Sequence, residues 1–161
     1  MKAFSVFLLT LVLGTSFAVA ADRPQPPIAG SQAPAFSLPS QEGAEVSLDQ
    51  FKGKWVVLYF YPEDFSSGCT VEAYNFQRDI DKYTEKNAVL VGVNFKVLAD
   101  SNHEVVQKYG SIMEYNGMIL AARNTFLIDP TGVIRKVCLK VSPQGHSQEV
   151  LADLQQLQSA K

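Results

Sequence analysis

The chain has 161 residues, 47% of them hydrophobic, which suffices for one globular domain with its own core and leaves little room for a second. Its 14 basic and 16 acidic residues nearly balance, and no block of like charge occurs. The composition therefore excludes the basic footprint of a nucleic-acid-binding protein and the acidic tail of a chain with a charged partner.

Residues 1–20 are predicted to form a secretory signal peptide. Lys2 precedes an apolar run from Ala3 to Ala20, which ends in the small-residue triplet Ala18-Val19-Ala20 expected at a cleavage site. A retained membrane anchor is the alternative because the run is almost long enough to span a bilayer, but the break at Gly14-Thr15-Ser16 favours removal. We expect an exported protein, in the periplasm of a bacterium, with no stable membrane association after cleavage.

A proline-rich segment follows the signal. Three prolines within residues 21–27 predict a flexible lead-in over residues 21–28. Residues 29–161 then form the folded domain. No internal repeat or low-complexity tract interrupts this domain.

A buried strand and a helix are predicted on either side of the first cysteine. Residues 55–61 are seven consecutive apolar or aromatic residues, typical of a central strand covered on both faces, and Pro62 ends it. A loop over residues 63–68 leads to Cys69. Beyond it, apolar residues recur at steps of three and four, which predicts a helix with one buried face: Ala73, Phe76, Ile80 and Tyr83. Cys69 is therefore expected at a helix N-terminus, directly after a buried strand.

The rest of the chain alternates strands and helices. We expect a strand at residues 88–93, a helix at 103–109, and a strand at 125–128 that returns through the turn at 129–132 as an antiparallel partner at 133–141. The last helix has an apolar face formed by Val150, Leu151, Leu154 and Leu157. This order predicts a thioredoxin-like α/β fold, a three-layer sandwich with a central mixed sheet.

The chain contains two cysteines, Cys69 and Cys138, too few for a disulfide-stapled scaffold. They can form one structural disulfide, act as a peroxidatic and resolving pair, or comprise one reactive and one inert thiol. Position favours a reactive Cys69, because the thiolate is the nucleophile and a helix N-terminus stabilises negative charge. The alternative is a small, inert core residue.

The motifs around Cys69 resemble the peroxiredoxin family (AhpC/TSA superfamily), and within it the bacterioferritin comigratory protein or peroxiredoxin Q group. The family pattern is a proline, a threonine or serine four residues later, and the peroxidatic cysteine three beyond that; Pro62, Ser66 and Cys69 match it. The resemblance runs from about Gly30 to Leu157, and its other matching stretches are residues 33–39, 51–54, 59–62, 123–129 and 145–146.

The resemblance implies a role for each matching residue. Cys69 attacks the terminal peroxide oxygen and becomes a sulfenic acid. Ser66 holds the peroxide through its hydroxyl, and Pro62 shields the thiolate. Arg123 matches the arginine that supports the thiolate and the transferred oxygen, and Glu72 matches an acid that orients this arginine. No cofactor or metal is expected, and neither His103 nor His146 has ligand spacing to the cysteines.

Two departures from the family pattern are visible. Many members carry a resolving cysteine five residues after the peroxidatic one, where this chain has Tyr74. Cys138 matches no family resolving position, so we expect an idle thiol there, with a resolving role as the alternative. A one-cysteine cycle reduced by an external thioredoxin-like protein is therefore predicted, because cytosolic glutathione is not at hand after export.

The second departure is a missing segment. Family members carry about twenty residues, including a helix, after the strand that ends at about Asn94. Because a parallel neighbour needs a crossover of a dozen or more residues, Phe95 to Ala99 cannot pair beside the strand at 88–93. We expect the thioredoxin core to survive with a shortened sheet edge.

The predicted function is a thiol peroxidase that reduces hydrogen peroxide and organic hydroperoxides, as a monomer or weak dimer. A thioredoxin-like disulfide oxidoreductase is the first alternative, but Cys69-Thr-Val-Glu72 lacks the second cysteine of a Cys-x-x-Cys motif. The other alternative is a degenerate relative that keeps the fold as a non-enzymatic redox sensor or binding protein.

Overall fold

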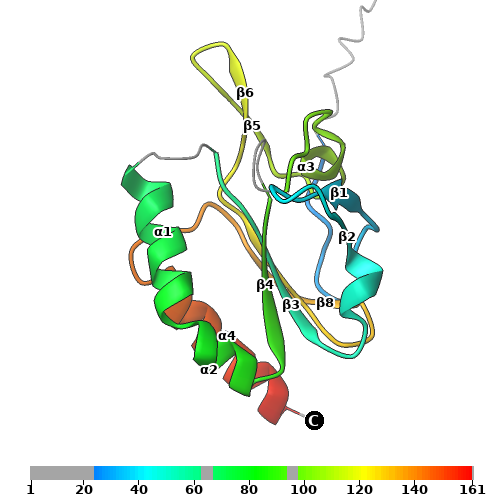
Figure 1. The fold of residues 1–161 in the computed structure, drawn as a ribbon, viewed down its shortest axis with the longest axis vertical. Helices are drawn as coiled ribbons and strands as arrows, with labels where there is room; N and C mark the ends of the chain where they lie inside the picture. Colours follow the sequence, from blue (N-terminus) through cyan, green and yellow to red (C-terminus); the bar gives the residue numbers. More distant parts are fainter. Residues whose placement is uncertain (1–23, 63–66, 94–97, 161) are drawn as a thin grey trace, which may run out of the picture.

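A computed structural model of the chain describes residues 24–62, 67–93 and 98–160. The predicted signal peptide and Ser66 lie outside these residues. The described elements, shown in Figure 1, are β1 (Ser37–Pro39), β2 (Glu45–Ser47), a 3₁₀ helix (Leu48–Phe51), β3 (Trp55–Phe60), α1 (Ser67–Arg78), α2 (Ile80–Glu85), β4 (Ala88–Val93), α3 (Glu104–Lys108), β5 (Ile112–Tyr115), β6 (Met118–Ala121), β7 (Thr125–Ile128), β8 (Ile134–Cys138) and α4 (His146–Ser159).

The main sheet has four strands in the order β4-β3-β7-β8. Strand β3 runs parallel to β4 in a register from Trp55↔Ala88 to Phe60↔Val93, and antiparallel to β7. Strand β8 returns antiparallel beside β7 through the turn that follows Ile128. The central mixed sheet and its four strands are therefore as predicted.

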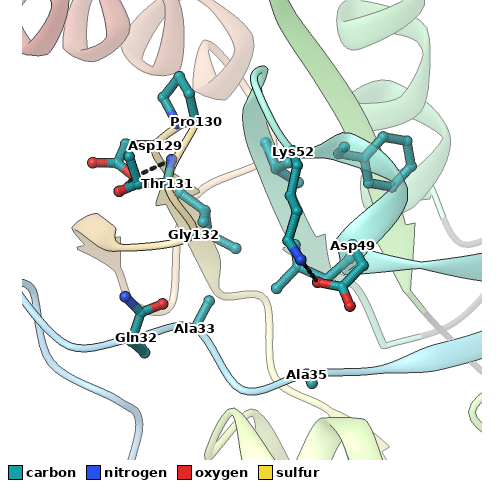
Figure 2. Close-up of a pocket in the computed structure, with 13 residues that line it drawn as sticks. Gln32, Ala33, Ala35, Asp49, Lys52, Asp129, Pro130, Thr131 and Gly132 are labelled. Carbon is teal, nitrogen blue, oxygen red and sulfur yellow. Dashed lines mark hydrogen bonds and ion pairs between the residues drawn. The ribbon is translucent and has the colours of Figure 1, made fainter.

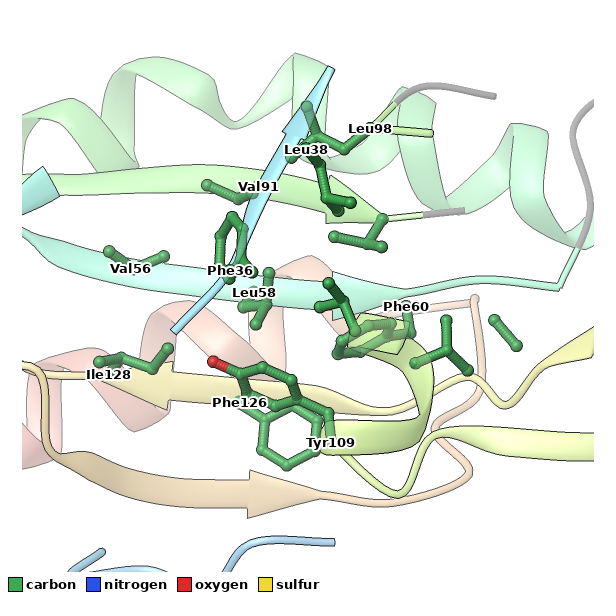
Figure 3. Packing of buried hydrophobic residues seen from close by; sticks show 14 of the residues in the cluster. Phe36, Leu38, Val56, Leu58, Phe60, Val91, Leu98, Tyr109, Phe126 and Ile128 are labelled. Carbon is green, nitrogen blue, oxygen red and sulfur yellow. The ribbon is translucent and has the colours of Figure 1, made fainter. Parts of the chain in front are cut away.

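The two faces of β3 pack into two separate cores because side chains of a strand alternate between faces. On one face, Trp55 and Val57 pack with side chains of α1, α2 and α4, which lie together on that side of the sheet (Figure 1). On the other face, Val56, Leu58 and Phe60 pack with residues of the N-terminal segment, α3 and β7 (Figure 3). Burial on both faces explains why the sequence of β3 is apolar or aromatic at every position.

The α1 face differs from the prediction. Ala73 is exposed, whereas Glu72 is buried and takes its place between Cys69 and Phe76. The helical run also divides, because α1 ends at Arg78 and α2 begins at Ile80. The apolar period predicted Ala73 on the buried face, and the structure places the charged Glu72 there instead.

A hairpin that the sequence analysis did not predict is formed by β5 and β6, which project from the body of the molecule (Figure 1). Its turn is Asn116-Gly117, and both residues have positive φ, 50° and 73°. An Asn-Gly pair between apolar segments is a strong hairpin signal because both central positions of a type I′ turn need positive φ. The hairpin ends at Ala121, two residues before Arg123.

The segment after β4 pairs elsewhere in the fold. Leu98 forms an antiparallel bridge with Ser40, and Ala99 N–H donates to Pro39 O at 3.0 Å. Leu98 is also buried in the core that contains Phe36. This part of the chain therefore extends the β1 region, and among the described residues no strand lies beyond β4, in agreement with a shortened sheet edge.

The described part of the lead-in, residues 24–28, contains no helix or strand but packs against the domain. Gly110 has a φ of 54°, and a Cβ at this position would come within 2.2 Å of Pro26 N. Only glycine permits so close an approach of two backbones.

A buried aspartate joins the two helical segments to α4. Asp79 is 1% exposed and accepts hydrogen bonds from Arg78, Lys82, Ser147 and Gln148 at 2.7–2.9 Å. The hydrogen bond from Arg78 is the largest of the contacts that hold the pKa of Asp79 well below its usual range. Asp129, in the β7–β8 turn, is similar: burial raises its pKa, but hydrogen bonds led by that from Thr131 outweigh it and lower the pKa to about 2.

Acid should destabilise the fold through these two aspartates. A carboxylate whose pKa is depressed in the folded state stabilises that state above its unfolded pKa of about 4, and this stabilisation is lost as the pH falls. Asp79→Asn should lower the free energy of unfolding at pH 7 by roughly 2 kcal/mol, because charged hydrogen bonds are lost. It should also flatten the pH dependence between about pH 5 and 2. Urea unfolding at several pH values measures both effects, and an unchanged slope in Asp79→Asn would contradict this account.

Candidate active site

Cys69 lies in the first turn of α1, the first described helix after β3. Its side chain is 4% exposed, and neither Cys69 nor Cys138 forms a disulfide. The first N–H groups of a helix have no intrahelical acceptors and carry the positive end of the helix dipole. The predicted position at a helix N-terminus is confirmed, and it favours a negatively charged sulfur.

Arg123 contacts the sulfur. Its Nη2 donates to Cys69 Sγ at 3.2 Å, and its Nη1 donates to Glu72 Oε2. Burial lowers the pKa of the Arg123 guanidinium, but the hydrogen bond to Cys69 and the negative charge of Glu72 outweigh it and raise that pKa. Arg123 is therefore a permanent cation beside the sulfur, with only 14% of its side chain exposed.

Glu72 joins this arginine to a histidine. Its side chain is 2% exposed, one turn after Cys69 on α1. Oε2 accepts from Arg123, and Oε1 lies 2.8 Å from His146 Nδ1 at the start of α4. Both carboxylate oxygens of this buried acid thus have partners, which a charge away from water requires.

The backbone next to Arg123 is fixed by a polar residue. Asn124 Nδ2 donates to Ser111 Oγ at 3.0 Å, and Asn124 Oδ1 accepts from Lys140 N at 2.9 Å. Arg123 O accepts from Val141 N–H at 3.0 Å. These bonds tie the start of β7 to neighbouring segments, which fixes the point from which Arg123 reaches α1.

Aromatic rings form the wall beneath this cluster. Tyr59 packs on Phe76 and Tyr61, with ring centroids 4.7 and 5.8 Å apart. Burial, with the negative charge of Glu72, raises the pKa of Tyr59 to about 12, so this phenol stays protonated. Gly92 lies opposite Tyr59 on β4, and a Cβ there would come within 2.7 Å of its hydroxyl.

The structure brings together three of the predicted site residues: Cys69, Glu72 and Arg123. Pro62 is partly buried directly after β3. Ser66 lies outside the described residues. Cys138 is not part of the cluster: it is half-buried on β8, opposite Thr125. Burial, followed by the charge of Asp153, raises the pKa of the Cys138 thiol.

The residue that sequence reasoning missed is His146. Its side chain is 1% exposed and lies against the ring of Phe76 as well as Glu72. The Gly145-His146 pair belongs to the matching stretches, but no spacing joins it to Glu72, 74 residues earlier. Only the docking of α4 on α1 reveals the contact.

A separate hollow lies at the other end of β3 (Figure 2). Lys52 and Asp49 form an exposed ion pair on one side of it, and Asp129 and Thr131 lie on the other. No cysteine or histidine is among the described residues that line it. The candidate nucleophile therefore lies in the cluster around Cys69 and not in this hollow.

Comparison with known proteins agrees with this site. A model of the AhpC/TSA family matches residues 29–95 and 92–137. Peroxiredoxin Bcp of Bacillus subtilis is 33% identical over 152 residues, covering 80% of this chain and 95% of that protein. The chloroplastic peroxiredoxin Q of Sedum lineare is 35% identical over 146 residues, covering 80% of this chain and 78% of that protein.

Solved structures show the same fold. A mutant of peroxiredoxin Q from Xylella fastidiosa superposes with a TM-score of 0.75 at 25% identity, covering 80% of this chain and 95% of that one. Peroxidoxin BcpB from Mycobacterium tuberculosis gives a TM-score of 0.71 at 27% identity, covering 79% and 96%. These neighbours confirm the thioredoxin-like peroxiredoxin fold.

The comparisons also bear on the missing segment. The two family matches meet where β4 ends. The alignment with the Bacillus subtilis protein is 152 residues long. It covers 80% of this 161-residue chain, which is about 129 residues. About 23 residues of the relative therefore have no counterpart in this chain. The length of the gap agrees with the deletion inferred from the sequence.

The positive charge of Arg123 beside Cys69 Sγ should be detectable in the ultraviolet absorbance of the sulfur. The ultraviolet thiolate absorbance at pH 7 should vanish in Cys69→Ser and persist in Cys138→Ser, because the raised pKa of Cys138 keeps that thiol protonated until the pH is well above neutral. Arg123→Met should lower the absorbance at pH 7, since it removes the positive charge 3.2 Å from the sulfur. Equal absorbance in Arg123→Met and the unmodified protein would contradict the role given to this contact.

Proposed function

The chain belongs to the AhpC/TSA family of peroxiredoxins, and we propose that it is a thiol-dependent peroxidase in which Cys69 attacks the peroxide. The observation that carries this proposal is the 3.2 Å contact from Arg123 Nη2 to Cys69 Sγ at the start of α1. A sulfur held between a helix N-terminus and a partly buried guanidinium is suited to nucleophilic attack as a thiolate.

The first step oxidises the sulfur. The Cys69 thiolate attacks the terminal oxygen of a hydroperoxide, so that an S–O bond forms while the O–O bond breaks. The bonding electron pair leaves with the other oxygen, which takes up a proton and departs as water or an alcohol. Cys69 becomes a sulfenic acid, oxidised by two electrons, and the peroxide is reduced by two. Arg123 is positioned to stabilise the negative charge as it moves from sulfur to oxygen.

Two residues of the matching motif complete the proposed site. Ser66 would hold the peroxide through its hydroxyl, and Pro62 would shield the thiolate from water. Support for both comes from their spacing to Cys69. Glu72 acts indirectly, because it accepts a hydrogen bond from Arg123, which in turn contacts the sulfur.

The second step reduces the sulfenic acid with an external thiol. A thioredoxin-like protein would attack the Cys69 sulfur, release water and form a mixed disulfide; its second thiol would then release Cys69 and leave that protein oxidised. Tyr74, which stands where many relatives have a resolving cysteine, is 67% exposed. Cys138 has a raised pKa, and among the described residues the hydrogen bonds that join Cys69, Glu72, Arg123 and His146 do not include it, so a one-cysteine cycle fits best.

A degenerate binding protein is not favoured. Loss of function would relax the selection that keeps a buried charge in place, because an unsatisfied buried ion is costly. Here both oxygens of the buried Glu72 keep partners, and the partly buried Arg123 bonds to Glu72 and to the sulfur. We propose a monomer or weak dimer.

Removal of the nucleophile tests the proposal. Cys69→Ser should reduce the rate of hydrogen peroxide consumption, with thioredoxin and its reductase as the electron source, by roughly three orders of magnitude or more. Cys138→Ser is the matched control and should keep the rate. Peroxide consumption that persists in Cys69→Ser would refute the assignment.

Mass measurement then distinguishes the two cycles. After one equivalent of peroxide, intact protein should gain one oxygen, localised to Cys69. Loss of two hydrogens with a Cys69–Cys138 linkage would show instead that Cys138 resolves the sulfenic acid.

Export is part of the proposal. Support comes from the pattern of residues 1–20, which lie outside the described residues. Within residues 24–62, 67–93 and 98–160, no helix is long and apolar enough to cross a membrane.

Expression of the full chain in a Gram-negative host should yield a periplasmic protein whose N-terminus is Ala21. Subcellular fractionation followed by N-terminal sequencing measures this outcome. A variant with arginine in place of Leu9 and Val12 interrupts the apolar run and should remain uncleaved in the cytoplasm. An uncleaved wild-type protein in the membrane fraction would favour the retained anchor.

A further inference from the structure

The imidazole of His146 is the most deeply buried group of the active-site cluster. It is 1% exposed, its ring stands at 69° to that of Phe76 with centroids 5.4 Å apart, and Nδ1 lies 2.8 Å from Glu72 Oε1. The chemical steps at Cys69 do not use this histidine. Its position at the first residue of α4 nevertheless aims one ring nitrogen at the acid that holds Arg123.

The surroundings of His146 fit a neutral ring with its proton on Nδ1. Among the described residues, Nε2 has no hydrogen-bond partner, and it is shielded from solvent. A ring protonated on both nitrogens would bury a charged N–H without an acceptor, which is costly. The neutral tautomer donates from Nδ1 to Glu72 and leaves the carboxylate its negative charge.

The two oxygens of Glu72 have different partners. Oε2 accepts from Arg123 Nη1, and Oε1 accepts from His146. Arginine and carboxylate otherwise favour a bidentate pair with two parallel N–H···O bonds. In this site the second nitrogen, Nη2, donates to Cys69 Sγ instead.

We propose that His146 is a positioning residue that keeps Arg123 on the Cys69 thiolate by occupying the second oxygen of Glu72. Without that donor, Oε1 attracts Arg123 Nη2, the pair closes into the bidentate form, and the sulfur loses its guanidinium contact. The inference rests on the proposed role of Cys69 and adds a residue that touches neither sulfur nor peroxide.

The titratable groups around His146 keep constant charges near neutral pH. Tyr59 on β3 and Tyr83 on α2 have raised pKa values, and Asp79 after α1 has a lowered one, so all three keep one charge state between about pH 5 and 9. Arg123 also stays charged there. Variants of His146 compared at pH 7 therefore differ in the contact to Glu72 while these four surrounding groups keep the same charges.

The test compares variants of His146 that keep its volume or its donor. His146→Phe keeps a ring against Phe76 but removes the donor, and should reduce the second-order rate constant for hydrogen peroxide at pH 7 by roughly tenfold or more. The thiolate absorbance at pH 7 should fall with it. His146→Asn places an amide N–H near the position of Nδ1 and should recover most of the loss.

The matched control is the other histidine. His103 caps α3, which packs on the opposite face of the sheet from α1 and α4 (Figure 1). Asparagine is among the residues that best tolerate its left-handed φ of 58°. His103→Asn should leave the rate and the thiolate absorbance unchanged.

A double-variant cycle separates positioning from folding. In Glu72→Gln the carboxylate that would capture Arg123 is absent, so adding His146→Phe should cause little further loss, whereas full additivity of the two losses would overturn the inference. If His146→Phe does not fold by circular dichroism, His146→Gln replaces it, because its amide reaches toward Nε2 rather than Nδ1. Equal rates for the Asn and Gln variants would then overturn the inference.

The outcomes also separate this inference from the proposed function. A wild-type protein that consumes peroxide, together with a His146→Phe variant that keeps both rate and thiolate absorbance, overturns the role of His146 alone. A wild-type protein that consumes no peroxide refutes the peroxidase, while the thiolate absorbance of the His146 variants still decides whether His146 holds Arg123 on the sulfur.

Discussion

The ion pair between the partly buried Arg123 and the buried Glu72 is the interaction on which the rest of the site depends. Moving two charges out of water costs several kcal/mol per ion, and this cost is offset only when the remaining hydrogen-bonding atoms also find partners. Glu72 finds its second donor in His146, and Arg123 finds its second acceptor in Cys69. The four side chains therefore form one hydrogen-bonded unit. In the proposed reaction, the Cys69 sulfur is the atom of this unit that is oxidised.

This unit exists only when three parts of the chain dock. Cys69 and Glu72 come from α1, Arg123 from the segment before β7, and His146 from the start of α4. Contacts outside the site hold these parts together: Tyr83 Oη donates to Ser147 O at 2.8 Å, and Asp79 accepts from Ser147 Oγ at 2.9 Å. The packing of the helical layer on β3 is therefore a condition for the electrostatics at the sulfur.

The missing segment leaves this arrangement untouched because it lies at the edge of the sheet. Strand β4 keeps its full parallel register with β3, and Leu98 still enters the core. None of the four side chains of the unit comes from the region where the relatives are longer. The reactive groups come from the helices and from the segment before β7. The fold tolerates the loss of a segment at the β4 edge because the central strands remain covered on both faces.

Local patterns were sufficient to predict much of the fold and to select Cys69 as the candidate nucleophile. The apolar run at 55–61 predicted the central strand, observed at 55–60, and the turn after Ile128 predicted the β7–β8 hairpin. The spacing of Pro62, Ser66 and Cys69 carried the family resemblance that implies the reaction. The Asn116-Gly117 signal for β5 and β6 was also present in the sequence and was not used. What the tertiary structure alone decided is the environment of the sulfur: Glu72 is inside because Arg123 and His146, 51 and 74 residues away, satisfy it. The stability of a buried charge depends on such distant partners, and no local period encodes them.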